Sequence, residues 1–161
     1  DNTGANNIKA AHAAGLPYVD GYLFPCLSSS CPSAASQVTA TINNLRNTGA
    51  SIGTLWLDIE VYAWPSDQNY NRQFCTDMMN QAKAMGVIVG VYTNPNNWSQ
   101  IVGSSWTGLS SLPLWWANWS GQQNFNGFTP FGGWNAPSIR QYQGDVSGPC
   151  SVSMDRNWYP D

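Results

Sequence analysis

The chain is 161 residues long; 9% of its residues are charged and 13% are aromatic, with nine Trp and a formal net charge of −3. The apolar and aromatic content argues against disorder, the six scattered basic residues argue against nucleic-acid binding, and no apolar run reaches the roughly 18 residues of a membrane span. A surface of amides, hydroxyls and indoles suits hydroxyl-rich ligands, of which sugars are the obvious class.

The hydrophobic pattern predicts alternating helices and strands in the first part of the chain. Helices are expected over residues 6–14, 36–48 and 69–85, and strands over residues 18–24, about 53–61 and 87–92. A short helix over 96–101 precedes three further predicted strands, 114–119, 138–142 and 152–155, joined by loops of Gly, Pro, Ser and Asn. This rhythm predicts a parallel sheet or barrel in one α/β domain, residues 1–161, with a helix-poor C-terminal third.

Four cysteines bear on the compartment. The even count predicts two disulfides in an oxidising environment, of which Cys26–Cys31 is favoured as a local clasp and Cys75–Cys150 follows by elimination. The loose CLSSSC spacing and the single histidine, His12, argue against a zinc site. Sequons at Asn97 and Asn118 are compatible with secretion, and the absence of an initiator Met and a signal peptide predicts a processed or incomplete chain.

The stretch TLWLDIEVY, residues 54–62, reads as a buried strand that contains two carboxylates, Asp58 and Glu60, the only glutamate. Residues two apart in a strand share a face and lie roughly 6.5–7 Å apart. The two acids should therefore project together, with Leu57, Ile59 and Val61 on the opposite face. Sites of α/β sheets and barrels gather at the carboxyl ends of strands, where such a pair is what glycosidic bond cleavage requires.

Other readings of the acid pair stay open. An Asp-x-Glu triplet can cap a helix, pair with an arginine or bind a divalent cation. No third and fourth oxygen ligand is evident nearby, so neither a metal nor a cofactor is predicted.

Six motifs in order, AAGLPYVDGYLFPC, LWLDIEVY, VGVYTNPNNW, PLWWANW, IRQYQGD and MDRNWYP, resemble glycoside hydrolase family 25, the Chalaropsis-type lysozymes. The resemblance implies a TIM-like (β/α)5(β)3 barrel. It also implies hydrolysis of the β-1,4 bond between N-acetylmuramic acid and N-acetylglucosamine in peptidoglycan, by a protein that is secreted, extracellular or located in lysosomes or phagosomes.

Site residues follow from the same resemblance. Glu60 would be the proton donor, Asp58 the stabilising or orienting carboxylate, and Asp155 an aspartate on the last strand. An ion pair of Asp155 with Arg156 or Arg140 is its competing reading. The predicted substrate-binding residues are Tyr22, Tyr92, Trp119, Gln141 and Asn118, and packing inside the barrel competes with sugar stacking for the aromatic ones.

The resemblance lacks its beginning. The family starts with two strands, the first carrying an aspartate, whereas Asp1 already lies beyond them, so only strands three to eight are expected here. An N-terminally incomplete barrel has open edges, which a missing segment or a partner chain would cover. The alternative function is therefore a non-catalytic glycan-binding or structural pseudoenzyme; a chitinase is disfavoured because its longer acidic run is absent.

Overall fold

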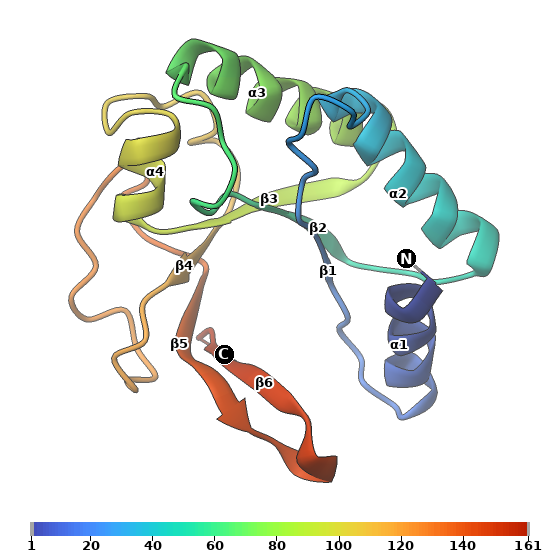
Figure 1. Cartoon of the computed structure of the whole chain (residues 1–161). Helices are drawn as coiled ribbons and strands as arrows, with labels where there is room; N and C mark the ends of the chain where they lie inside the picture. Colours follow the sequence, from blue (N-terminus) through green and yellow to red (C-terminus); the bar gives the residue numbers. More distant parts are fainter. Residues whose placement is uncertain (1, 161) are drawn as a thin grey trace.

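The computed structural model describes residues 2–160 and shows an α/β fold with one six-stranded sheet in the order β1-β2-β3-β4-β5-β6 (Figure 1). The strands from β1 to β5 pair in parallel, and β5 and β6 form an antiparallel hairpin. Among the described residues the sheet does not close, because β1 and β6 are its two edges. The predicted incomplete barrel is thus confirmed.

The elements follow the predicted order. The helices are α1 (Asn2–Ala13), α2 (Ala34–Thr48), α3 (Gln68–Ala84) and α4 (Pro95–Ile101), with a 3-10 turn η1 (Pro149–Ser151). The strands are β1 (Gly21–Leu23), β2 (Thr54–Asp58), β3 (Ile88–Thr93), β4 (Leu114–Ala117), β5 (Ile139–Ser147) and β6 (Ser153–Trp158). The strand β5 runs five residues past its predicted end because β6 pairs with it, across two register shifts.

Short polar side chains fix where the helices begin. Asp67 caps α3 by accepting hydrogen bonds from the backbone N–H groups of Asn69 and Tyr70, and Asn94 caps α4 in the same way through Asn97. Both caps follow directly on segments that leave the carboxyl ends of β2 and β3. The helices therefore start on the side of the sheet where the acidic residues lie.

The core lies between the sheet and the helices α2 and α3, which run side by side over one face of it (Figure 1). Leu57 and Ile59 of the acidic segment are both 0% exposed in this core, as the alternation predicts. The same prediction is wrong for Val61. This residue is 49% exposed, because β2 ends at Asp58 and the chain turns away from the sheet.

Trp98 of α4 is the centre of a cluster of tryptophan rings in the core. Trp98 is 0% exposed and stacks on Trp106, with ring centroids 5.4 Å apart, while Trp134 meets it edge-on at 4.8 Å. Part of the tryptophan content that suggests sugar binding thus serves packing. None of the helices within residues 2–160 combines the length and apolar character that a membrane crossing requires.

One predicted disulfide is present and the other is wrong. Cys26 and Cys31 are bonded, with their Cα atoms 5.7 Å apart. Cys75 is buried in α3 and Cys150 is exposed in η1, and both are free thiols. Figure 1 shows η1 at the far tip of the β5–β6 hairpin, on the opposite side of the molecule from α3. Pairing by elimination fails because it assumes that every cysteine is oxidised.

Candidate active site

The two acids of the TLWLDIEVY stretch lie where β2 ends. The residue between them, Ile59, is still held to β3: its N–H donates to the carbonyl of Tyr92 over 2.9 Å, and its carbonyl accepts from the hydroxyl of Thr93 over 2.8 Å. Because Ile59 points into the core, its neighbours Asp58 and Glu60 point to the other face of the sheet. The structure therefore brings the two carboxyl groups together.

Asp58 is the more deeply placed acid. It is 5% exposed, and its Oδ1 atom is buried without a hydrogen-bond partner among residues 2–160, whereas Glu60 is half-buried. Burial, followed by the charge of Glu60 and the contact with its carboxyl group, raises the pKa of Asp58 to about 8. The pair consequently retains a proton in neutral solution.

A hydrogen-bond network links three other predicted residues beside the acids. Gln141, 3% exposed on β5, accepts at Oε1 from the Tyr92 hydroxyl and from the Trp119 indole N–H, each over 2.7 Å. Its Nε2 donates to Asp155 Oδ2 over 3.2 Å. This one amide thus connects β3, the loop after β4, and β6.

Asp155 is oriented by a second donor, the backbone N–H of Asp145, over 2.9 Å. Asp145 lies in the bulged part of β5 and has a φ of 54°, in the left-handed region. The alternative ion pairs of Asp155 are not formed: Arg156 donates to Gln143 over 3.3 Å, and Arg140 donates to the loop after β4. No sequence signal points to the role of Asp145.

The charges of three acids act on the hydroxyl of Tyr92. Burial raises the pKa of its hydroxyl well above the ordinary value, and the charges of Glu60, Asp58 and Asp155 add to this in that order. All three predicted acids therefore act on a single side chain, although they come from β2, the loop after it, and β6. The sheet topology, rather than nearness in sequence, brings them to one place.

Asn118 supports the loop that carries Trp119. Its side-chain oxygen accepts from the guanidinium of Arg140 over 2.6 Å, and its carbonyl accepts from the same group over 3.2 Å. Arg140 is 1% exposed, packs over the ring of Trp116 at 4.5 Å, and also donates to the carbonyl of Asn124 over 2.8 Å. Burial lowers the pKa of Arg140. Direct contact of Asn118 with a sugar stays a prediction.

Tyr22 lies on the edge strand β1, on the other side of the carboxyl pair from Gln141, and is 65% exposed. It pairs in register with Trp56, two residues before Asp58, so both share the face of the acids. Sequence reasoning does not single out two nearby rings, Phe24 and Tyr62, which are 49% and 41% exposed. Each follows a predicted site residue by two positions, Tyr22 and Glu60, and that period-2 spacing is the signal that could have found them.

Within residues 2–160, no group of three or more His, Cys, Asp or Glu side chains is arranged to hold a metal ion. Asn97, the asparagine of the first sequon, is 9% exposed, and its side-chain oxygen accepts a hydrogen bond from the backbone N–H of Val61 over 3.1 Å.

Known proteins resemble this chain over nearly its whole length. A family profile described as Lysozyme-like protein 1 matches residues 1–142. The chain is 49% identical over 160 residues to Lysozyme-like protein 5 of Caenorhabditis elegans, covering 99% of this chain and 74% of that protein. It is 43% identical over 155 residues to the Probable GH family 25 lysozyme 4 of Dictyostelium discoideum, covering 96% and 71%.

The chain belongs to the glycoside hydrolase family 25 lysozymes. The resemblance inferred from six motifs is thereby confirmed, and with it the assignment to the glycoside hydrolases. A solved structure, the Clostridium perfringens spore cortex lytic enzyme SleM, superposes with a TM-score of 0.77 at 22% identity, covering 99% of this chain and 55% of that one. That likeness shows that the two chains share the same fold.

Proposed function

We propose that this family 25 lysozyme is a muramidase that hydrolyses the β-1,4 bond between N-acetylmuramic acid and N-acetylglucosamine in bacterial peptidoglycan. Glu60 is the proton donor, and Asp58 is the stabilising or orienting carboxylate. The observation that carries the proposal is the interacting carboxyl pair at the end of β2, of which Asp58 is buried with a pKa raised to about 8.

The pair supplies the acid that the reaction needs. Two carboxyl groups in contact do not both ionise easily, so their titration belongs to the pair, and one proton stays bound near neutral pH. Asp58 is only 5% exposed, whereas Glu60 is half-buried and is therefore the more accessible acid of the two. The shared proton therefore leaves through Glu60 to the glycosidic oxygen.

Asp155 is the third carboxylate of the proposed site. It is held by hydrogen bonds from Gln141 and from the N–H of Asp145. A fixed carboxylate there stabilises the positive charge that develops at the anomeric carbon as the bond breaks.

Sugar binding is assigned to the residues around the acids. Tyr22 and Trp119 present exposed rings, 65% and 58% exposed, that suit the C–H faces of sugars. Gln141 and Asn118 bring amide groups to the same region, and the buried ring of Tyr92 lies near the three acids. Peptidoglycan is the substrate, and a secreted or lysosomal location is consistent with the Cys26–Cys31 disulfide.

The direct test is the release of reducing ends from peptidoglycan by the wild-type chain and by Glu60→Gln. We expect a loss of about 10²–10⁴-fold in the variant, the size of a general-acid contribution. Asp77→Asn on α3 is the matched control, because it also removes one carboxylate but lies outside this site. Equal release by Glu60→Gln and the wild type would refute the assignment, and glycan binding without release by the wild type would favour the pseudoenzyme.

A further inference from the structure

Two exposed aromatic rings form a stacked pair at the rim of the site. The ring centroids of Phe24 and Tyr62 lie 4.2 Å apart with an interplanar angle of 26°. Both rings are close to half exposed, so the pair offers a flat apolar surface to solvent. Stacking of this kind is common in cores, but a stacked pair left open to water presents area that a ligand can cover.

The pair borders the carboxyl pair on its β1 side. The parallel register sets Tyr22 beside Trp56 and Leu23 beside Leu57, and Phe24 follows directly after the end of β1. Tyr62 follows Glu60 by two residues. Its hydroxyl feels the acid as well: burial first, and then the charge of Asp58, raises the pKa of Tyr62 to about 12. The flat surface thus lies near the carboxyl pair.

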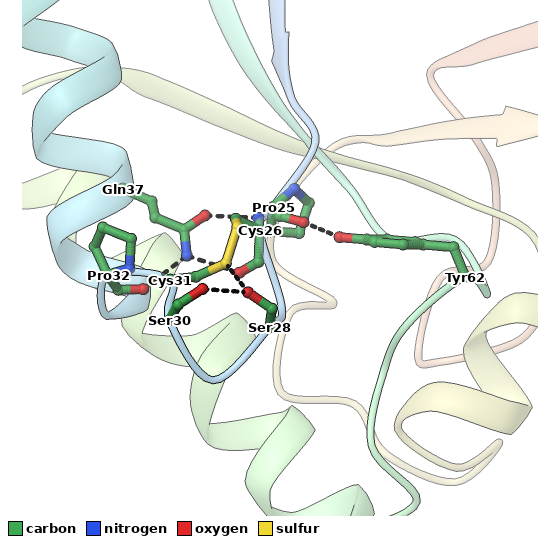
Figure 2. The surroundings of a disulfide bond; sticks show 8 residues. All are labelled: Pro25, Cys26, Ser28, Ser30, Cys31, Pro32, Gln37 and Tyr62. Carbon is green, nitrogen blue, oxygen red and sulfur yellow. Dashed lines mark hydrogen bonds between the residues drawn. A yellow bond between two sulfur atoms is a disulfide. The ribbon is translucent and has the colours of Figure 1, made fainter.

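Tyr62 is held by a braced loop, shown in Figure 2. The Tyr62 hydroxyl donates to the carbonyl of Pro25, next to the disulfide Cys26–Cys31. Gln37 of α2 accepts from the N–H of Cys26 over 2.8 Å and donates to its carbonyl over 2.9 Å, closing a two-bond clamp. The loop is therefore fixed to α2, and Tyr62 is fixed to the loop.

We propose that the Phe24–Tyr62 pair is a sugar-binding subsite, on which an N-acetylhexosamine unit stacks its apolar C–H face while its neighbour in the glycan reaches the acids. The Cys26–Cys31 loop positions this subsite. Rigid aromatic side chains suit the task because they offer large contact areas at a low cost in conformational entropy. The inference rests on the proposed function, since the bound glycan is the substrate of the carboxyl pair.

The test is calorimetric binding of a soluble tetrasaccharide of alternating N-acetylglucosamine and N-acetylmuramic acid. It is done in the Glu60→Gln background, so that no hydrolysis interferes. Phe24→Leu and Tyr62→Leu keep apolar bulk but remove the flat ring, and each should weaken binding about tenfold. Tyr18→Leu is the matched control, because Tyr18 is an exposed ring, 85% exposed, at the other end of the segment that leads into β1.

The positioning role of the loop has its own variants. Tyr62→Phe retains the ring and loses only the hydrogen bond to Pro25, so binding should weaken about threefold. Cys26→Ser with Cys31→Ser should act in the same direction through the same loop. In chains that retain Glu60, all of these changes should raise KM for peptidoglycan and leave kcat within about twofold, since they affect ground state and transition state alike.

The outcomes distinguish a failure of the proposed function from a failure of the subsite alone. If the Glu60→Gln chain binds no tetrasaccharide at all, the proposed function fails. If it binds, but Phe24→Leu and Tyr62→Leu bind as tightly as Tyr18→Leu, the subsite is refuted and the pair is only a packing contact of the loop. A fall in kcat with unchanged KM in folded variants, checked by their thermal unfolding, would also overturn it.

Discussion

The two sides, or flanks, of the carboxyl pair, one next to β1 and the other formed by β4 to β6, differ in their side chains and contacts. On the β1 side, the rings of Tyr22, Phe24 and Tyr62 are all more than two-fifths exposed, and Tyr62 is held by the disulfide loop. On the β4–β6 side, hydrogen bonds converge on Gln141, which is 3% exposed. The second flank fixes Asp155 directly through a hydrogen bond, whereas the first is held by its own loop. The comparison predicts that the β1 flank governs affinity and the β4–β6 flank governs turnover.

The sharpest way to break this comparison is Gln141→Leu. The change removes the acceptor of Tyr92 and Trp119 and one donor to Asp155, so several groups lose their positions at once. Misplacement of this kind costs about 100-fold in kcat. Gln143→Leu is the control two residues away, since Gln143 binds only Arg156 at the surface and should leave kcat within about twofold.

Asp58→Asn tests the buried proton that lies between the flanks. A pKa of about 8 in the folded chain, against 3.8 for an unperturbed group, means that folding favours the protonated form. The stability that this group contributes is complete below about pH 4 and is lost as pH rises through about 8, by at most about 1.4 kcal/mol per pH unit. The neutral Asn removes this loss.

The melting temperature of Asp58→Asn should therefore gain on that of the wild type as pH rises from 4 to 8. Thermal unfolding at several pH values measures the difference, and Asp77→Asn again serves as the control. Parallel curves for wild type and Asp58→Asn would show that Asp58 ionises in the folded chain as it does in the unfolded one.

Arg140→Met probes the loop of the polar flank. Three backbone carbonyls, those of Asn118, Asn124 and Asn126, lose their donor, which should cost about 2–3 kcal/mol of unfolding free energy. Urea unfolding measures this cost. Arg46→Met removes an exposed guanidinium that binds a single carbonyl, that of Met85, and should cost much less. Equal costs would mean that the Arg140 contacts do not stabilise the loop.

The smallest effect is expected for the cysteines. Cys26→Ser with Cys31→Ser opens a loop of a few residues and should lower the unfolding free energy by about 2 kcal/mol. Cys150→Ser should change nothing, because Cys150 is an exposed free thiol. A destabilisation by Cys150→Ser as large as that of the double variant would contradict the unpaired state, and thiol titration of the native protein gives an independent count.

Much of the fold is local enough to be predicted. The helices α2 and α3 and the strands β2 and β3 lie within a few residues of their predicted ranges, because hydrophobic period and glycine stops specify them. The extent of β5 could not be predicted, since its last residues become a strand only through pairing with β6. Trp98 and Trp134 illustrate the same limit. The sequence does not distinguish a tryptophan that packs in the core from one that binds a sugar, and both of these are buried.

The sequence by itself determined the order of the elements and the common face of Asp58 and Glu60, because side-chain direction alternates along any strand. Only the tertiary structure decided that Asp58 is the more deeply buried acid of the pair, that Gln141 joins three segments, and that Cys75 and Cys150 stay apart. Each of these depends on which distant groups surround a residue, and burial and hydrogen bonding are properties of those surroundings rather than of the residue type.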